Sequence, residues 1–251
     1  NKQSLINDQV NSIIEDSEGD LWYGTNNGIS LQKSKTGKWH SYLSTFENVQ
    51  NSKNHIFTTL CEVSPGIIWA GGYFSGIYQI DKRTSKTTYF TPALYAREDI
   101  RPDKYIRDIR KDSHGYIWTG GYYNLKRINV QTKDIRLYHG LHSVTAIIEK
   151  DDKSMWIGTA TGLHLLDKES GKFERIQLPV ESTYIYSLYQ TKKGSLYIGT
   201  SGSGVLIYDP QTKLFTHYYT GNCAMISNNI YTILSDEDNE ILLSTESGLT
   251  S

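Results

Sequence analysis

Short runs of alternating hydrophobic and polar residues recur along the whole chain, separated by turns rich in Gly, Asn, Asp and Ser. In the first group, these runs cover residues 10–15, 21–25, 29–33 and 39–43. Alternation over four to six residues predicts half-buried β-strands, and the short turns predict antiparallel pairing. No segment of useful length has the period of a helix, so we predict an all-β fold built from four-stranded antiparallel sheets.

The pattern repeats every 44 residues or so, a period of roughly the length that marks a repeat architecture. Its clearest marker is Leu21-Trp22-Tyr23-Gly24-Thr25, which returns at residues 68–72, 117–121, 155–159, 196–200 and, in degraded form, 241–245. A parallel β-helix has shorter coils, and a β-sandwich does not need such regular repetition. We therefore predict a β-propeller.

We expect one propeller domain, or a fragment of one, over residues 1–251. The predicted blades are approximately residues 10–46, 55–92, 105–140, 143–180, 184–220 and 229–251. The sixth repeat stops within its third strand, so the chain holds about five and a half blades. Because an incomplete ring leaves an exposed sheet edge, we expect a longer ring or one that another copy completes.

Several positions recur across the repeats and indicate structural roles. The first strand opens on an apolar residue, followed two places later by a mostly small one; the pairs are Val10/Ser12, Ile56/Thr58, Ile106/Asp108, Val144/Ala146, Ile185/Ser187 and Ile230/Thr232. A Gly follows the second strand at 28, 76, 162, 204 and 248, and Asn124, which tolerates left-handed backbone, takes its place once. The third strand ends in Asp81, Asn129, Asp167 or Asp209, whose side chains favour a turn. We expect the repeated Trp22, Trp69, Trp118 and Trp156 to be structural.

Composition agrees with this fold and excludes some functions. The 19 Tyr, 5 Trp and 21 Gly suit strands and tight turns, whereas a formal net charge of −1 disfavours a surface that follows nucleic-acid phosphates. Cys61 and Cys223 give neither a disulfide framework nor a metal spacing, and we expect both to be buried thiols. No apolar run approaches the ~20 residues that span a bilayer, and no signal-peptide pattern is present at Asn1.

The repeated phrase resembles the two-component regulator propeller repeat. Repeat one carries it as Ile14-Glu15-Asp16, Gly19, Leu21-Trp22, Gly24-Thr25 and Gly28-Ile29, and repeat four carries it from Met155 to Thr159, at Gly162-Leu163 and at Asp167. The resemblance covers roughly residues 10–250. Repeats two and three depart from it, with Gly-Gly in place of Gly-Thr.

Such repeats are found in the periplasmic sensor region of hybrid two-component receptors from Bacteroides-type bacteria. The resemblance implies a seven-bladed ring, often two in tandem, followed in the parent chain by a β-sandwich, a membrane helix and a histidine kinase. It also implies a phosphorelay that regulates transcription, an oligosaccharide cue from a complex glycan, and a non-catalytic role for this chain. A homodimer and contacts with further blades are compatible with it. The family motif is structural and transfers no ligand-contacting residue.

In a four-stranded meander, the turns between the second and third strands lie at the same end as the connections between blades. Loops at this end are rich in aromatic and charged residues, whereas the turns at the opposite end are short and generic. Aromatic rings beside polar groups suit sugars, which present C–H faces and hydroxyls, and function concentrates on loops. The predicted ligand-binding residues are Tyr73, Phe74, Tyr105, Arg107, Tyr122 and Tyr123, with His55 and Tyr184 as weaker candidates. Packing between blades, or against a protein partner, is an equally good explanation of these aromatics.

Catalytic and metal-binding alternatives have little support in the sequence. The 7 His show no metal-ligand spacing, and neither a nucleophile elbow nor a phosphate-binding loop is present. The acidic residues 236–240 and 151–153 fill turn positions of the repeat, so a solvated turn is a better interpretation than a calcium site. We therefore predict no catalytic residue, no metal and no cofactor. The alternatives are a propeller lyase acting on an antibiotic or glycan, and a protein-interaction scaffold.

Overall fold

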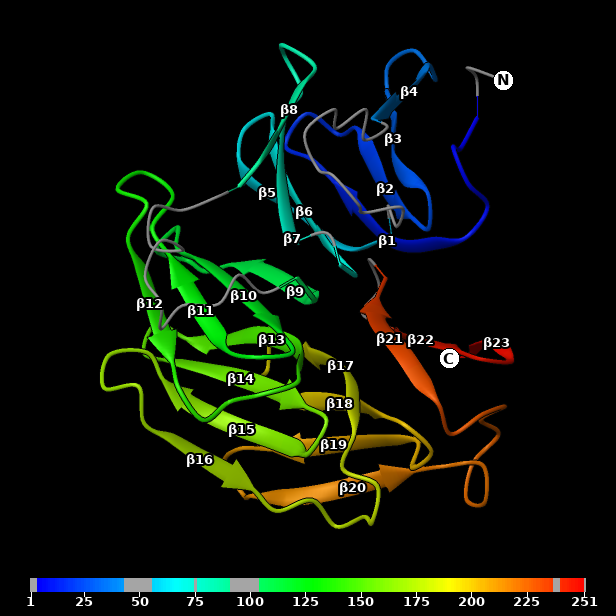
Figure 1. Ribbon diagram of the computed structural model, residues 1–251. Helices are drawn as coiled ribbons and strands as arrows, with labels where there is room; N and C mark the ends of the chain where they lie inside the picture. Colours follow the sequence, from blue (N-terminus) through cyan, green and yellow to red (C-terminus); the bar gives the residue numbers. More distant parts are fainter. Residues whose placement is uncertain (1–3, 43–55, 75, 91–103, 237–239, 251) are drawn as a thin grey trace. The chain divides into compact units, whose positions relative to one another are not determined.

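The computed structural model describes residues 4–42, 56–74, 76–90, 104–236 and 240–250. Its 23 strands form six antiparallel sheets, and in each sheet the strands lie side by side in chain order (Figure 1). Five sheets have four strands and the last has three, β21 to β23. The all-β architecture of antiparallel blades is confirmed, and the number of blades in the ring stays a prediction. Among the described residues, no helix is long and apolar enough to cross a membrane.

The chain divides into two compact units, Asn1–His139 and Gly140–Ser251, and each is described by itself. The first unit contains blades 1 to 3. Their strands are β1 (Val10–Glu15), β2 (Leu21–Thr25), β3 (Gly28–Gln32), β4 (Trp39–Tyr42), β5 (Phe57–Ser64), β6 (Ile67–Gly72), β7 (Gly76–Asp81), β8 (Lys86–Tyr89), β9 (Ile106–Lys111), β10 (Ile117–Gly121), β11 (Leu125–Ile128) and β12 (Ile135–Tyr138).

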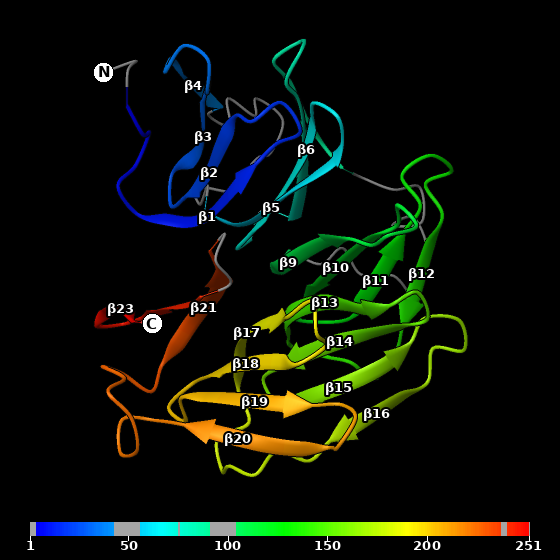
Figure 2. The same ribbon diagram turned by 180° about the vertical axis from the view of Figure 1, so that it is seen from behind.

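The second unit contains blades 4 to 6, and Figure 2 shows their strands from behind. These strands are β13 (Val144–Asp151), β14 (Ser154–Thr159), β15 (Gly162–Asp167), β16 (Phe173–Ile176), β17 (Ile185–Gln190), β18 (Leu196–Thr200), β19 (Val205–Asp209), β20 (Leu214–Tyr218), β21 (Ile230–Ser235), β22 (Ile241–Thr245) and β23 (Gly248–Thr250). Below, the four strands of a blade are called A to D in chain order.

The hydrophobic cores lie between successive blades of a unit. One core joins Trp22, Ile29 and Leu31 of blade 1 to Phe57 and Leu60 of blade 2. Equivalent clusters join blades 2 and 3, blades 4 and 5, and blades 5 and 6. The four repeated tryptophans are at most 1% exposed, so the prediction that they are structural is confirmed.

The Gly of the Trp-x-Gly phrase is required because the next blade packs directly on it. A Cβ on Gly71 would lie 2.5 Å from Cγ2 of Ile106, and a Cβ on Gly158 would lie 2.8 Å from Cγ2 of Ile185. Both isoleucines open strand A of the following blade. The phrase therefore joins blades, because only a residue without a side chain allows this close approach.

The predicted alignment of repeat two is wrong by one residue. Strand A of blade 2 opens on Phe57, not Ile56, because Phe57 pairs with Gly72 as Val10 pairs with Thr25 in blade 1. The small residue opposite Gly71 is consequently Thr59 rather than Thr58. Ile56 lies before the strand, where its carbonyl accepts a hydrogen bond from Tyr73 N at 3.1 Å.

The predicted turns are largely confirmed. Asp81, Asn129, Asp167 and Asp209 each accept a hydrogen bond on their Oδ1 from a backbone amide two or three residues ahead. The Gly after strand B has a positive φ in all five repeats that carry it. Asn124 is the exception, because it does not adopt a positive φ, and the turn of blade 3 has a different conformation.

A buried ion cluster holds blade 2 against blade 1. The Lys82 ammonium, in the C–D turn of blade 2, lies 2.6 Å from Asp16 Oδ2, 2.6 Å from Asp20 Oδ2 and 2.7 Å from Glu18 Oε2 of blade 1. Burial of Asp16 disfavours its charge, but hydrogen bonds from Lys82 and Trp22 outweigh burial and lower its pKa. The aspartates are therefore ionised groups that join two blades. In the second unit, Lys168 makes a comparable pair with Glu149.

Candidate functional site

The B–C turn takes two forms, and the difference selects the candidate site. In blade 1, Thr25 Oγ1 donates a hydrogen bond to the carbonyl of Gly28 at 2.8 Å and accepts one from Asn27 N at 3.1 Å. Threonines of blades 4, 5 and 6 donate the same bond to the glycine carbonyl; they are Thr159, Thr200 and Thr245. In blades 2 and 3, Gly72 and Gly121 replace this Thr, so the turn lacks its side-chain closure.

The two Gly-Gly turns present aromatic residues at their tips. A Cβ on Gly72 would overlap the carbonyl oxygen of Ile56, so Gly is the residue that fits there. Tyr73 follows Gly72 in blade 2, and Tyr122 follows Gly121 in blade 3. Tyr122 N donates a hydrogen bond to the carbonyl of Tyr105 at 3.3 Å, which holds the turn beside the start of strand A.

Six of the eight predicted ligand-binding residues come together in the first unit. We call them the aromatic cluster: Tyr73, Phe74, Tyr105, Arg107, Tyr122 and Tyr123. Tyr105 lies at the centre of the cluster. Its ring centroid is 4.5 Å from that of Phe74, 6.1 Å from that of Tyr73 and 6.1 Å from that of Tyr122.

Tyr123 and Arg107 lie at the edges of the aromatic cluster. Tyr122 and Tyr123 pack edge to face, with ring centroids 5.0 Å apart. Arg107 Cζ lies 5.6 Å from the centroid of the Tyr73 ring, which is within cation–π range. The cluster therefore combines exposed ring surface with a guanidinium that can donate hydrogen bonds to a bound hydroxyl or carboxylate.

Exposure distinguishes presented rings from packed ones. Phe74, Tyr122 and Tyr123 are 49%, 58% and 37% exposed. The central Tyr105 is half-buried. Phe74 also has a φ of 59°, a left-handed conformation that costs a non-glycine residue about 1–2 kcal/mol. A large apolar ring held in solvent by strained backbone is typical of a functional site.

The other two predicted residues are not part of this cluster. His55 lies outside the described residues. Tyr184 belongs to the second unit, where its ring centroid is 5.0 Å from that of Tyr186. Tyr186 is in turn 5.1 Å from Tyr231, which is 43% exposed. Sequence reasoning missed Tyr186 and Tyr231, which lie on strand A, although it included Arg107 from the same position of blade 3. Their signal is their position, one residue after the apolar residue that opens the strand.

The second unit has a hollow of about 360 Å³ at the ends of blades 4 and 5, lined by residues of their turns. Lys150 and Asp151 at its rim form an ion pair of 2.7 Å. Burial disfavours the charge of Asp151, but hydrogen bonds from Lys150, Ser154 and the Lys153 amide together outweigh burial and lower the pKa of Asp151 to about 2. The charges of Lys150 and Asp151 thus neutralise each other within the turn, and we assign no ligand to the hollow.

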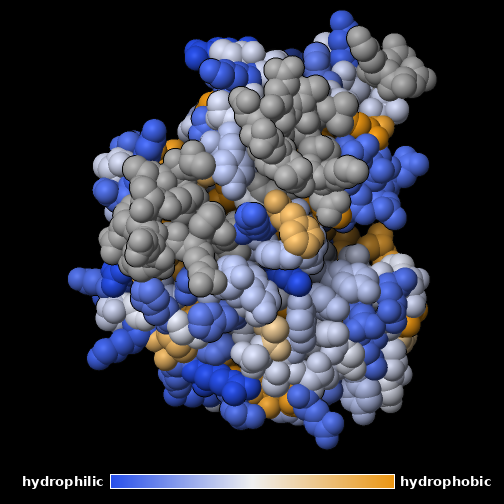
Figure 3. All heavy atoms as spheres, in the orientation of Figure 1, coloured by the Kyte–Doolittle hydropathy of each residue, from blue (hydrophilic) through white to orange (hydrophobic). Residues whose placement is uncertain are grey.

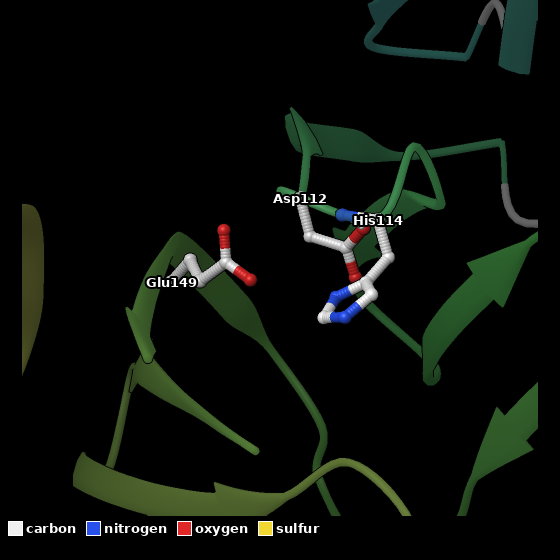
Figure 4. Close-up of side chains that lie close together, drawn as sticks. All are labelled: Asp112, His114 and Glu149. Atoms are coloured by element: carbon white, nitrogen blue, oxygen red, sulfur yellow. Dashed lines mark hydrogen bonds between the residues drawn. The ribbon is translucent and has the colours of Figure 1, made fainter. Parts of the chain in front are cut away.

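Figure 4 shows Asp112, His114 and Glu149, which are residue types that bind metals. The Asp112 carboxylate accepts hydrogen bonds from His114 N, Tyr116 N and Trp118 Nε1 at 2.8 to 3.1 Å, so it organises the β9–β10 turn. Glu149 belongs to the other unit. We therefore assign no metal site to these three residues.

Cys61 and Asp236 have structural settings, and the expectation that Cys61 and Cys223 are both buried is wrong, since both are partly exposed. Burial raises the pKa of the Cys61 thiol to about 11, so at neutral pH Cys61 is a protonated, weakly nucleophilic side chain. Asp236 Oδ1 accepts a hydrogen bond from Glu240 N at 2.8 Å, as a turn residue does.

Figure 3 shows a mainly polar face on which hydrophobic residues form small separate areas.

Comparison with known proteins gives a consistent result. The family model for the two component regulator propeller matches residues 4–27 and 179–202, which overlap repeats one and five. Histidine kinase P4 of Formosa agariphila is 26% identical over 262 residues, which cover 96% of this chain and 18% of that protein. The chain thus spans less than a fifth of the length of this relative.

Solved structures share the fold. The extracellular domain of the hybrid two-component system BT3049 from B. thetaiotaomicron superposes with a TM-score of 0.80 at 20% identity, covering 98% of this chain and 34% of that one. Streptogramin B lyase superposes with a TM-score of 0.74 at 14% identity, covering 94% of this chain and 76% of the lyase. At these identities the likeness concerns the fold alone.

Proposed function

Because the chain carries two-component regulator propeller repeats, we propose that it is a ligand-sensing, non-catalytic part of a hybrid two-component receptor. The match of the family model in two repeats and the histidine kinase relative support this proposal. The relative is much longer than this chain, so kinase activity, the phosphorelay and the transcriptional output belong to a parent protein. In that parent, the chain lies on the periplasmic side of the inner membrane, as part of a seven-bladed ring followed by a β-sandwich.

The proposed ligand is an oligosaccharide derived from a complex glycan, and the proposed site is the aromatic cluster. The single observation that carries this assignment is the exposure of Phe74, Tyr122 and Tyr123 around the packed Tyr105. Stacking of a sugar ring on such a platform uses the same ring faces that aromatic pairs use. Arg107 supplies a donor for the hydroxyls at the edge of the sugar.

Isothermal titration calorimetry of the 251-residue chain against oligosaccharides released from plant and host glycans tests this function. We expect at least one oligosaccharide to bind, and we expect Tyr122→Ala and Tyr73→Ala each to weaken its Kd about ten-fold, or about 1.4 kcal/mol. The matched control is Tyr218→Ala, which removes a ring that is 42% exposed on the outer strand β20. If both cluster variants bind as the wild type does, the site assignment is wrong.

The fold likeness to streptogramin B lyase favours one second candidate, a propeller lyase. A propeller lyase would need a catalytic His or Tyr together with a carboxylate or a metal, and the aromatic cluster contains tyrosines but no histidine and no carboxylate. Incubation of the chain with a streptogramin B antibiotic and with glycan polymers, followed by mass spectrometry, separates the two candidates. Cleaved product would establish the enzyme, whereas binding of oligosaccharide without turnover supports the sensor. A protein-interaction scaffold would bind neither.

A further inference from the structure

Strand A of every blade contains a β-bulge at its second residue. The register shifts between the first and third residues of the strand, and this leaves one residue unpaired. A bulge re-aims the side chain of its extra residue out of the regular alternation. The six bulge residues are Asn11, Thr58, Arg107, Thr145, Tyr186 and Tyr231.

Where the bulge residue is short and polar, it joins its blade to the next one. Thr58 Oγ1 donates a hydrogen bond to the carbonyl of Ile106 at 2.7 Å, and Thr145 Oγ1 donates one to the carbonyl of Ile185 at 2.6 Å. Asn11 Nδ2 makes the same link to the carbonyl of Phe57 at 3.1 Å. The structural role of the bulge is therefore a hydrogen bond between blades, and a small polar side chain performs it.

The bulge residue is larger in the other three blades: Arg107 in blade 3, Tyr186 in blade 5 and Tyr231 in blade 6. In blade 5 the bond to the next blade comes instead from the following residue, as Ser187 Oγ lies 3.5 Å from the carbonyl of Ile230. The link between blades thus has a second donor, although a longer one, and does not require Tyr186. A residue that breaks a local structural rule, with compensation next to it, is a mark of a functional position.

The two tyrosines form a continuous platform with Tyr184. The ring of Tyr186 lies between the other two, with centroids 5.0 Å from Tyr184 and 5.1 Å from Tyr231, and Tyr231 at the end is 43% exposed. Rings at these separations are in direct contact, so no space remains between them for a cation such as an aromatic cage holds. The platform can therefore act only through its outer ring surface.

We propose that Tyr184, Tyr186 and Tyr231, here called the tyrosine ladder, are a saccharide-stacking site of the second unit. An apolar C–H face of a pyranose ring matches an open platform of ring surface, whereas a cation or a peptide anchor needs an enclosing pocket. The proposal rests on the proposed function for its ligand class. It adds a second place of contact, in the second unit, which the aromatic cluster does not include.

Affinity electrophoresis of the 251-residue chain in gels containing xylan, arabinan, galactan, levan or mixed-linkage β-glucan tests the ladder. The decisive variant is Tyr186→Thr, because Thr is the bulge residue of blades 2 and 4 and restores the link to the Ile230 carbonyl. We expect Tyr186→Thr to keep or raise the melting temperature and to lose at least five-fold in affinity for a retarding polysaccharide. We expect Tyr231→Ala to lower the affinity for that polysaccharide by a similar factor. Tyr231→Phe keeps the ring, and we expect it to bind as the wild type does.

Controls separate this proposal from the proposed function. Tyr218→Ala, on β20 of the same unit, should migrate as the wild type does. If Tyr122→Ala loses binding while Tyr186→Thr and Tyr231→Ala do not, the tyrosine ladder is refuted and the aromatic cluster stands. If the ladder variants lose binding and Tyr122→Ala does not, the ladder stands and the site assigned under the proposed function falls. Absence of retardation by every polysaccharide overturns both.

Discussion

Replacing Lys82 with Met should destabilise the first unit far more than a surface lysine substitution does. The side chains of Lys82, Asp16 and Asp20 are 5%, 0% and 6% exposed, and the ammonium lies 2.6 Å from an oxygen of each aspartate. Removing one partner of a buried ion pair costs about 3–5 kcal/mol, because the remaining charge is buried without compensation. Asp16 keeps its hydrogen bonds from Trp22 and from backbone amides. We therefore expect Lys82→Met to lower the free energy of unfolding by about 3 kcal/mol, at the lower end of this range.

The matched control is Lys33→Met. Lys33 also pairs with Asp20, at 2.9 Å, but its side chain is 31% exposed, and such a pair contributes only about 0–1 kcal/mol. Urea unfolding followed by tryptophan fluorescence measures both values, since Trp22 donates its indole N–H to Asp16. If Lys82→Met costs no more than Lys33→Met, the ion cluster does not hold blade 2 against blade 1.

The pH dependence of this difference has a definite sign. The lowered pKa values of Asp16 and Asp20 mean that their contribution is complete above the ordinary carboxyl range, near pH 4, and is lost as pH falls through the lowered values. Burial of Lys82 disfavours its charge, but its three carboxylate partners outweigh burial and raise its pKa. The gap between wild type and Lys82→Met should therefore be constant from pH 5 to 9 and shrink in acid.

Three further predictions concern backbone and thiol. Gly71→Ala should cost about 1–3 kcal/mol in urea unfolding, because the new methyl would lie 2.5 Å from Ile106 Cγ2; an unchanged midpoint would contradict the packing. Lys213 has a φ of 61°, so Lys213→Gly should raise the free energy of unfolding by about 0.5–1 kcal/mol. Gly37 has a φ of 64° in the equivalent turn, so Gly37→Lys should lower the free energy of unfolding by about 1 kcal/mol. Equal effects of the two substitutions would refute the strain argument. Cys61, with its pKa raised to about 11, should react with iodoacetamide at pH 8 about a hundred-fold more slowly than an ordinary thiol, until urea exposes it; rapid native labelling would exclude this environment.

Much of the fold could be predicted from the sequence, because each repeat independently shows the same pattern of strands and turns. Trp22 and Gly24 recur at fixed places, and their copies are buried or closely approached by the next blade. Alignment failed in repeat two, since both Ile56 and Phe57 are apolar and only the pairing of Phe57 with Gly72 distinguishes them. The prediction that Asn124 takes the place of the turn glycine also failed. Asn tolerates left-handed backbone, but Asn124 does not adopt it.

The candidate site was only partly accessible to sequence reasoning. Tyr73 and Tyr122 could be found because Gly-Gly replaces Gly-Thr before them, and the structure shows why a side chain does not fit at Gly72. Tyr186 and Tyr231 were not found, because a bulge changes where a strand residue points and alternation alone assigns it to the wrong face. Such positions become visible when the residue between the apolar and the small position of strand A is compared across all six blades.

Hydrogen–deuterium exchange, with and without the oligosaccharide that binds best in calorimetry, tests the central claim most directly. The account predicts that bound sugar protects amides of the aromatic cluster, at residues 73–74, 105–107 and 122–123. Turns at the opposite end of the blades, such as Gly66 and Gly194, should exchange as before. Protection confined to those turns, or no protection at all in the presence of saturating ligand, would contradict recognition of the sugar by the aromatic cluster.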